Sequence, residues 1–186
     1  CNISKKEAID LIEQVILQGT STTHAIYIVN AHTLNLAAEN PGYHETLNSA
    51  FRVFGDGTGV RWAARQRGVV MSDNLVGTDL LPELFESTSG RGYRYFLLGG
   101  DPQTISRAAE ACSTRYPGWD LAGFHQGYLH RDNASETISL INEAKPDVLL
   151  VGMGNPLQEQ WIHEHQHQLK VAVAIGVGGL FDHWAG

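Results

Sequence analysis

The chain has 186 residues, with 20 acidic against 13 basic side chains and a formal net charge of -7. Hydrophobic residues make up 42 % of it and charged residues 18 %, a globular composition that excludes a disordered chain. The acidic balance argues against a general nucleic-acid binder and against strong electrostatic attachment of this segment to anionic membranes, since both need a basic surface. The two cysteines, Cys1 and Cys112, imply no disulfide framework and favour a reducing compartment.

The predicted elements alternate between helices and strands along the chain. A capping box at Ser4 and Glu7 begins a helix that Gly19 ends. Short apolar runs predict six strands, at 25–29, 52–54, 93–98, 120–124, 147–151 and 171–175. Helical spacing predicts further helices at 59–66, 80–87, 104–115, 134–144 and 156–169. This order indicates an α/β fold with a doubly wound, Rossmann-like, mostly parallel sheet, and no linker divides residues 1–186 into more than one domain.

Both ends of the sequence bear on the expected assembly. The chain begins at Cys1 rather than Met and stops at Gly186, directly after an apolar stretch. We therefore expect a trimmed chain in which Leu180, Phe181 and Trp184 are left uncovered. An exposed apolar patch of this kind predicts self-association, so we expect a homo-oligomer.

Four of the predicted strands end in polar or glycine-rich loops, at 30–33, 55–59, 98–102 and 152–156. Ligands of open parallel sheets bind beyond the carboxyl ends of the strands. Glycines at the start of a helix let backbone N–H groups approach a phosphate. A single such loop is commonly a simple hinge, but four at one edge favour a binding site. The sequence has no complete G-x-G-x-x-G, so the fingerprint for a nicotinamide cofactor is weak.

Asp56 stands between two glycines at the end of a predicted strand. A carboxylate there is placed to accept a proton from a hydroxyl nucleophile. It is equally suited to close a turn or to cap the helix that follows. The loop alone leaves these two roles open.

Gln158 lies in the first turn of the predicted helix 156–169. At about 100° per residue it falls within the apolar stripe formed by Leu157, Trp161, His165 and Leu169, whereas Glu159 falls outside it. A buried amide needs hydrogen-bond partners, so Gln158 either caps the neighbouring loop or contacts a sugar or phosphate.

His163, Glu164 and His167 match the H-E-x-x-H motif of zinc proteases. On the predicted helix both histidines lie opposite the apolar stripe and face solvent, and the sequence suggests no third ligand. We therefore expect a polar helix face rather than a metal site.

Seven motifs follow one another along the chain: Asn30, 55–60 (GDGTGV), 76–80 (VGTDL), 96–100 (FLLGG), Gly123 with 127–128, 152–159 (GMGNPLQE) and 176–182 (GVGGLFD). Together they resemble the WecG/TagA/CpsF family of bacterial glycosyltransferases, from about Ile26 to the end of the chain. The resemblance implies an inverting, metal-independent enzyme with no cofactor. The sequence agrees in lacking the D-x-D pair of metal-dependent glycosyltransferases.

The resemblance also implies the substrates. A hexose or N-acetylhexosamine, such as N-acetylmannosamine, passes from a UDP-sugar to a polyprenyl-diphosphate-linked acceptor in the synthesis of cell-surface polysaccharide or teichoic acid. The enzyme is then a cytoplasmic, peripheral protein at the inner face of the bacterial plasma membrane. It contacts the membrane through an Arg-rich C-terminal segment that this chain lacks, and binds no nucleic acid.

Site residues are carried over motif by motif. Asp56 matches the proposed base, and Asn30 and Gln158 match polar groups that line the sugar pocket. Asn74 departs from the pattern, because it stands where many members carry an arginine. With the glycine loops, the expected substrate-binding residues are Asn30, Thr33, Asn74, Gly77, Gly99, Gly100, Gly127, Tyr128, Gly152, Gly154, Asn155 and Gln158.

Two other classes of function remain as alternatives. One is a nucleotide-dependent oxidoreductase of Rossmann type, against which the missing G-x-G-x-x-G counts. The other is a non-catalytic module that binds nucleotide sugars. Replacement of Asp56 abolishes turnover in a transferase and leaves ligand binding by such a module untouched.

Overall fold

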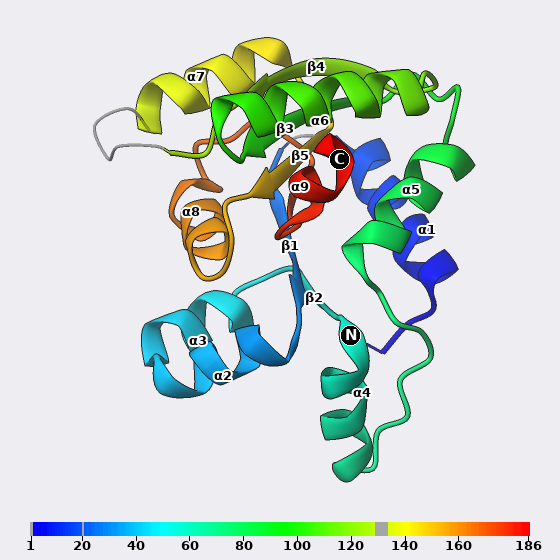
Figure 1. The fold of residues 1–186 in the computed structure, drawn as a ribbon, viewed down its shortest axis with the longest axis vertical. Helices are drawn as coiled ribbons and strands as arrows, with labels where there is room; N and C mark the ends of the chain where they lie inside the picture. Colours follow the sequence, from blue (N-terminus) through cyan, green and yellow to red (C-terminus); the bar gives the residue numbers. More distant parts are fainter. Residues whose placement is uncertain (1, 20, 129–133) are drawn as a thin grey trace.

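A single sheet of six parallel strands organises the molecule (Figure 1). The structure, a computed structural model, describes residues 2–19, 21–128 and 134–186. The strands lie in the order β2-β1-β6-β5-β3-β4. Their bounds are β1 His24–Val29, β2 Arg52–Gly55, β3 Arg94–Gly99, β4 Asp120–His125, β5 Val148–Gly152 and β6 Val173–Gly176. The predicted doubly wound, Rossmann-like α/β fold is confirmed, with each strand within two residues of its expected place.

The helices fill the connections between the strands. They are α1 Lys5–Gln18, α2 Ala31–Glu39, α3 Pro41–Asn48, α4 Gly57–Gln66, α5 Gly77–Ser87, α6 Pro102–Arg115, α7 Ala134–Ala144, α8 Leu157–His165 and α9 Leu180–Ala185. The predicted capping box is present at the start of α1, where the side chains of Ser4 and Glu7 each accept a backbone N–H of the other residue. Reciprocal bonds of this kind satisfy N–H groups that a helix start leaves free.

Alternate side chains of the inner strands β1, β3, β5 and β6 pack into two different layers. On β1, Ile26 and Ile28 join a core with residues of α1, α5, α6 and α9. Tyr27 and Val29 point the other way and join a core with residues of α2, α3, α7 and α8. Burial on both faces explains why the strands read as continuous apolar runs.

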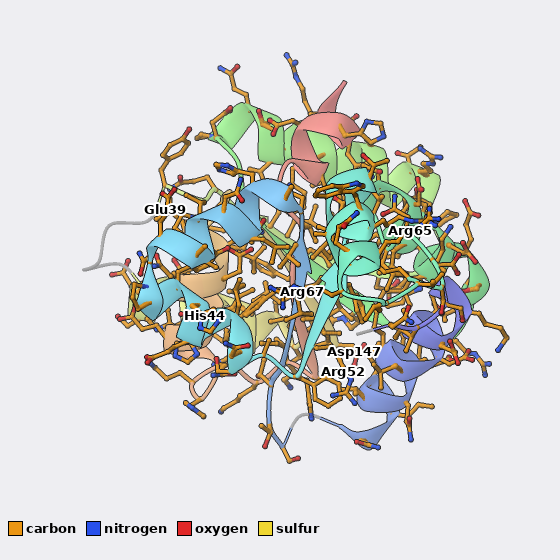
Figure 2. All side chains as sticks on the ribbon, turned by 90° about the horizontal axis from the view of Figure 1, so that it is seen from below. Glu39, His44, Arg52, Arg65, Arg67 and Asp147 are labelled. Carbon is orange, nitrogen blue, oxygen red and sulfur yellow. The ribbon has the colours of Figure 1, made fainter. Side chains whose placement is uncertain are left out.

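Helix α4 belongs to neither layer. None of its residues is buried, and it projects from one end of the molecule, where it contacts α2 (Figure 1). In the view from this end of the molecule, Arg65 and Arg67 lie on the α4 segment, while Glu39 and His44 mark α2 and α3 (Figure 2). The sheet therefore carries two packed layers and one projecting helix.

Three short helices differ from the sequence-based expectation. Residues 30–33 were expected to form a loop, but Asn30 caps α2 and Ala31 begins it. Its capping box pairs Asn30 with Thr33 rather than with Glu or Gln, so the usual signature is missing. Helix α3 follows at once, because Asn40 caps it and Pro41 takes its first position. Helix α9 forms in the stretch that was expected to lie uncovered.

The expectation of an exposed C-terminal patch is wrong. Leu180, Phe181 and Trp184 are buried, and they join the core that includes α6 and α5. The Trp184 ring lies within 6.4 Å of the rings of Phe85, Tyr116 and Phe181, measured between centroids. The argument for self-association through these residues therefore loses its basis.

The predicted inward face of α8 is wrong at two positions, Leu157 and Glu159. Leu157 is 61 % exposed, whereas Gln158, Glu159 and Ile162 are fully buried. The helix starts at Leu157 and packs on β1, β5 and β6 through the face that carries these three residues. The inward position expected for Gln158 is therefore confirmed, whereas Leu157 and Glu159 have exchanged the places that the pattern of apolar residues gave them.

Candidate active site

The loops that follow all six strands lie along one edge of the sheet, because the strands are parallel. Taken across the sheet, this edge begins with Asp56 after β2 and Asn30 after β1. It continues with the loops at 177–179 after β6 and 152–156 after β5. It ends with 100–101 after β3 and 126–128 after β4. The topology thus brings most of the predicted site residues to a common edge.

The side chain of Asp56 is not used as a helix cap. It occupies the N-cap position of α4, yet its side chain makes no capping hydrogen bond. Its backbone N–H donates to the carbonyl of Val29 at 2.8 Å, which fixes the residue between β2 and β1. Burial raises the pKa of the Asp56 carboxyl, and the nearby charge of Asp79 raises it further. Of the two roles that the sequence left open, the helix-cap role is not seen.

The loop that carries Asp56 is held by Asn74. The Asn74 Oδ1 accepts the backbone N–H of Gly57 at 2.7 Å. The N–H of Leu75 donates to the carbonyl of Gly55 at 3.2 Å. These two bonds hold the residues on either side of Asp56, so Asn74 helps to fix the loop that carries the carboxylate.

Glycine loops form a cavity of about 330 Å³ at the carboxyl ends of β3, β5 and β6. We call it the glycine cavity. It is lined by Gly100, Asp101, Gly127, Tyr128, Gly152, Met153, Gly154, Leu157, Gly178, Gly179 and Asp182. Five of the predicted binding residues, Gly100, Gly127, Tyr128, Gly152 and Gly154, therefore line one space.

Close backbone contacts explain why glycine is needed there. A Cβ on Gly99 would collide with the carbonyl group of Gly152, and one on Gly127 would lie 2.7 Å from the Gly99 Cα. Two hydrogen bonds join the same loops, from Gly100 N–H to the Gly152 carbonyl at 3.1 Å and from Gly127 N–H to the Gly100 carbonyl at 2.9 Å. The cavity wall is thus a rigid piece of backbone.

Two carboxylates border the glycine cavity. Asp101 caps α6 by accepting the N–H groups of Gln103 and Thr104 at 2.8 and 3.0 Å. Hydrogen bonds, first among them the one from the backbone of Thr104, hold the pKa of Asp101 below its usual range. Asp182 on α9 is exposed at the opposite wall. Carboxylates in these places suit hydroxyl donors of a ligand better than its phosphates.

Gln158 and Glu159 form a buried polar network that holds the site together. Both residues have no exposed surface. The Glu159 carboxylate accepts hydrogen bonds from the Tyr43 hydroxyl at 3.0 Å, from Asn155 Nδ2 at 2.6 Å and from Gln158 Nε2 at 2.7 Å. The Gln158 Oε1 accepts the N–H of Gly178 at 3.0 Å. Through this chain of bonds α8 fixes the loop that follows β6.

Burial raises the pKa of Glu159, although the hydrogen bonds from Gln158, Tyr43 and Asn155 oppose the rise. The expectation that Glu159 lies outside the inward face was wrong. Glu159 was also not among the expected site residues. One signal was available, because Asn155 and Glu159 are four residues apart around a helix start. The amides of Asn155 and Gln158 are both engaged inside the protein, which gives these two residues a structural part in the site.

Three other predicted residues line neither of the cavities described here. Asn30 and Thr33 bond to each other in the cap of α2, with Thr33 N–H donating to Asn30 Oδ1 at 3.0 Å. Gly77 is the first residue of α5, and a Cβ there would touch the Ile28 side chain at 3.4 Å. Their binding roles stay predictions.

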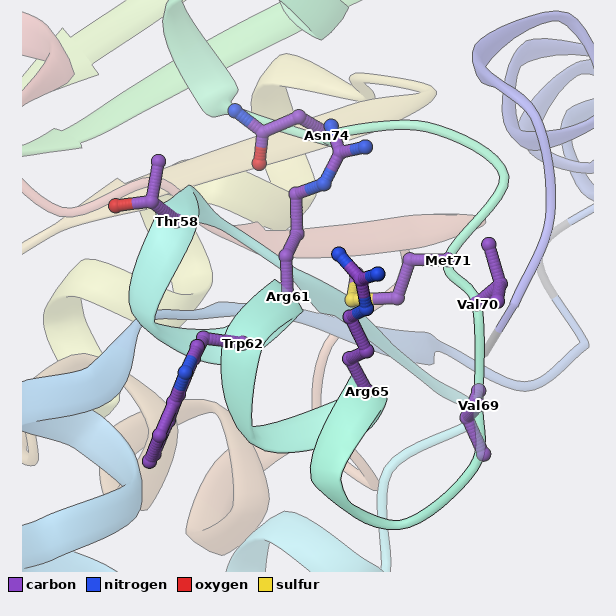
Figure 3. Close-up of a pocket in the computed structure, with 8 residues that line it drawn as sticks. All are labelled: Thr58, Arg61, Trp62, Arg65, Val69, Val70, Met71 and Asn74. Atoms are coloured by element: carbon purple, nitrogen blue, oxygen red, sulfur yellow. The ribbon is translucent and has the colours of Figure 1, made fainter.

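A second and larger pocket, of about 600 Å³, lies beside α4 (Figure 3). We call it the α4 pocket, and its lining residues are Thr58, Arg61, Trp62, Arg65, Val69, Val70, Met71 and Asn74. Arg61 and Arg65 extend from α4 toward the loop that carries Met71 and Asn74 (Figure 3). Only Asn74 was expected at a site, because helical spacing gave no sign that α4 stands away from the sheet.

Among the residues that the structure describes, no three His, Cys, Asp or Glu side chains gather where a metal ion could be held. His163 and His167 are exposed, which confirms the predicted orientation of the H-E-x-x-H segment. The His163 ring is hydrogen-bonded to the Ser49 hydroxyl at 2.9 Å. Within the same described residues, no helix combines the length and the apolar character needed to cross a bilayer.

Comparison with known proteins adds a family and several relatives. The family model described as "Glycosyl transferase WecG/TagA/CpsF family" matches residues 1–186. Relatives from Staphylococcus aureus strains NCTC 8325 / PS 47 and COL are named N-acetylglucosaminyldiphosphoundecaprenol N-acetyl-beta-D-mannosaminyltransferase. Each is 32 % identical over 170 residues, which cover 90 % of this chain and 66 % of the relative. The chain thus spans just under two thirds of the length of these curated relatives.

Proposed function

Because this chain belongs to the WecG/TagA/CpsF family of glycosyl transferases, we propose that it takes part in the transfer of an N-acetylhexosamine, such as N-acetylmannosamine, from a UDP-sugar. The acceptor is a sugar carried on polyprenyl diphosphate, in line with the acceptor that the names of its relatives give. The reaction belongs to the synthesis of cell-surface polysaccharide or teichoic acid. The enzyme works as a peripheral protein at the inner face of the plasma membrane, where such an acceptor is anchored.

Asp56 carries this proposal. An acceptor hydroxyl is a weak nucleophile at neutral pH, and a positioned base accelerates its attack by roughly 10²–10⁴-fold. Asp56 lies at the carboxyl edge of the sheet with its side chain unused by the helix it precedes. A raised pKa makes it a better proton acceptor than an ordinary aspartate.

A single base supports a single displacement. In the proposed step the acceptor oxygen forms a bond to the anomeric carbon of the donor as the bond from that carbon to the UDP oxygen breaks. The hydroxyl proton passes to the Asp56 carboxylate, and UDP leaves with the electron pair. Attack from the side opposite the leaving group inverts the anomeric centre, as in other inverting sugar chemistry that uses a base without a protein nucleophile.

We assign the donor to the glycine cavity. Backbone N–H groups of the loop at 152–154 face the diphosphate, because glycines allow its close approach. Asp101 already occupies the first N–H groups of α6, so we place donor hydroxyl groups, rather than phosphates, near Asp101 and Asp182. Asn74 and the Gln158–Glu159 pair act as positioning residues, for the Asp56 loop and for the Gly178 loop.

The test is transfer by the intact protein from UDP-N-acetylmannosamine to N-acetylglucosamine diphosphate on a polyprenol, followed by mass spectrometry. We expect a disaccharide product whose new linkage has the inverted configuration by NMR, and the same rate when EDTA is added. Loss of activity with EDTA and recovery with a divalent metal would reject the metal-independent mechanism.

A binding measurement separates the transferase from an oxidoreductase. At about ten times its dissociation constant, UDP should stabilise the protein by about 1.4 kcal/mol, whereas NAD should leave the melting temperature unchanged. Stabilisation by NAD alone would favour a Rossmann-type oxidoreductase. Stabilisation by UDP without any transfer would favour a module that only binds nucleotide sugars.

A further inference from the structure

The α4 pocket combines cationic and apolar side chains in one space. Arg61 and Arg65 line it together with Val69, Val70 and Met71. Its volume of about 600 Å³ lies within the range of pockets that hold small molecules. The pocket belongs neither to the glycine cavity nor to the Glu159 network, and it needs a ligand that carries negative charge and apolar surface together.

The positive charge of this segment is locally uncompensated. Residues 57–71 contain Arg61, Arg65 and Arg67 and no acidic residue, in a chain whose net charge is -7. Within the described part of the chain, none of the three forms an ion pair with a carboxylate. Arginine is the residue best suited to bind a phosphate through two parallel hydrogen bonds.

The apolar part of the same segment is left in contact with solvent. Trp62 is 67 % exposed, Val70 79 % and Val69 43 %. Helix α4 buries none of its residues against the rest of the protein. Three apolar side chains exposed beside two arginines need an apolar partner to cover them.

The α4 pocket also shares a wall with the loop of the proposed base. Thr58, two residues after Asp56, lines the pocket, and so does Asn74, which accepts the N–H of Gly57. A ligand held here therefore lies beside the loop that carries Asp56. In a sugar diphosphate the charged group is bonded directly to the sugar, so phosphates on the arginines would place the sugar toward Asp56.

We propose that the α4 pocket binds the isoprenoid diphosphate of the lipid-linked acceptor, with the diphosphate on Arg61 and Arg65 and the first isoprene units against Trp62, Val69 and Val70. This inference rests on the proposed function for the identity of the acceptor. A single isoprenoid diphosphate explains the pocket better than a general anionic membrane surface does. The three arginines of residues 57–71 give little attraction to such a surface, because the net charge of the chain is -7. A pocket with two arginines in its lining suits a single diphosphate head group.

Direct binding tests the inference without any need for turnover. Farnesyl diphosphate, a soluble isoprenoid diphosphate, is titrated into the intact protein by calorimetry, next to farnesol and inorganic diphosphate. We expect farnesyl diphosphate to bind at least about tenfold more tightly than either half alone, since the pocket offers both kinds of contact. The double variant Arg61→Gln/Arg65→Gln should weaken its binding by about tenfold or more.

Arg107→Gln is the matched control, because Arg107 is an exposed arginine on α6 far along the chain from this pocket. It removes one positive charge and should leave the affinity for farnesyl diphosphate within about twofold, as expected for a distant surface charge. The melting temperature of the double variant and its stabilisation by UDP should match those of the wild type, which shows that the fold and the donor site are intact.

Three binding results would overturn the inference. One is an affinity for farnesyl diphosphate that the double variant leaves unchanged. Another is equal binding of inorganic diphosphate and farnesyl diphosphate, which would make the pocket a plain anion site. The third is a double variant that no longer binds phosphatidylglycerol vesicles but still binds farnesyl diphosphate. That result would reassign this face to the membrane surface.

Kinetics separate this inference from the proposed function. If the intact wild-type protein transfers the sugar, the double variant should raise the KM for the polyprenyl acceptor by about tenfold and leave the KM for the donor unchanged. Transfer with an unchanged acceptor KM rejects the pocket assignment alone. Absence of transfer by the wild type rejects the proposed function, and the binding of farnesyl diphosphate still decides the inference.

Discussion

Glu159 and Arg61 represent two regions of this molecule that use charged side chains in opposite ways. Glu159 has no exposed surface, and three side-chain groups donate hydrogen bonds to its carboxylate. Arg61 lies on a helix with no buried residue, in a segment without acids. A buried charge is costly unless the protein satisfies it, so the Glu159 network is complete in itself and acts as structure. Within the residues that the structure describes, the arginines of the α4 pocket have no carboxylate partner, which leaves their hydrogen-bonding capacity for a ligand.

Asp56 stands between these two extremes. It is partly buried, which raises its pKa, yet its side chain is not used to cap α4. Asn74 holds the loop of Asp56 by accepting the backbone N–H of Gly57, and this loop borders the α4 pocket. We propose that the Glu159 network serves stability, the α4 pocket ligand binding and Asp56 chemistry, and each proposal predicts a different result of mutation.

The largest effect is expected for Asp56→Asn. Asparagine keeps the shape of the side chain and caps a helix about as well as aspartate. It cannot take up the proton that the acceptor hydroxyl loses during the transfer. We expect kcat to fall by at least about a hundredfold, with the donor KM and the melting temperature unchanged. Steady-state assays of the intact protein measure this loss. Activity near that of the wild type in a folded Asp56→Asn variant would remove Asp56 as the base.

The next effect is on stability and concerns Glu159→Ala. This change leaves the Tyr43 hydroxyl and the amides of Asn155 and Gln158 buried without their acceptor, at about 1–3 kcal/mol for each unsatisfied group. We expect the free energy of unfolding to fall by about 3 kcal/mol, measured by urea denaturation.

Glu159→Gln is the matched variant. Its amide oxygen can accept from Asn155 and Gln158 while its NH₂ group donates to the Tyr43 hydroxyl, so most of the network survives. We expect it to lose less than about half of the stability that Glu159→Ala loses. Equal losses in the two variants would show that the packing of the side chain, and not its hydrogen bonds, matters at this position.

The same contrast between regions explains what the sequence could predict. The four inner strands β1, β3, β5 and β6 were found because each is a largely apolar run, a local signal that burial on both faces produces. The glycine cavity was foreseen for a similar reason, since parallel strands bring their loops to one edge. The short helices α2, α3 and α9 escaped because few residues define each of them, and α2 begins with an unusual cap.

The two polar regions depend on contacts that sequence spacing does not show. The Glu159 carboxylate is buried because Tyr43, which is 116 residues away along the chain, donates to it. The spacing of apolar residues along a helix predicts that polar residues between them face outward, so Glu159 was expected on the outer face. The α4 pocket arises because α4 packs on neither layer of the fold, and periodicity cannot reveal which helix lacks a partner.

A smaller effect is expected in the pH dependence of stability. The pKa of Glu159 is raised in the folded state, mainly by burial, above its value of about 4.3 in an unfolded chain. Its contribution to stability is therefore fully present below about pH 4.3 and is lost as the pH rises through the folded-state pKa. The residue in Glu159→Gln does not titrate, so the stability of the wild type relative to this variant should decline over that range. A relative stability that grows with pH would mean that the hydrogen bonds outweigh burial and lower the pKa.

The smallest effect is expected for Trp62→Ala. A buried tryptophan costs about 3–5 kcal/mol when it is truncated, and Trp184, in the core beside Phe85, is the matched example on α9. Trp62 is 67 % exposed on a helix that buries nothing, so its loss should change the free energy of unfolding by no more than about 0.5 kcal/mol. Denaturation of the two variants side by side gives the comparison. A cost for Trp62→Ala near that of Trp184→Ala would mean that α4 is packed in solution, and the separation between a structural network and a ligand-binding segment would then fail. A small cost combined with weaker binding of farnesyl diphosphate would mean that the exposed ring contributes to the ligand and not to the fold.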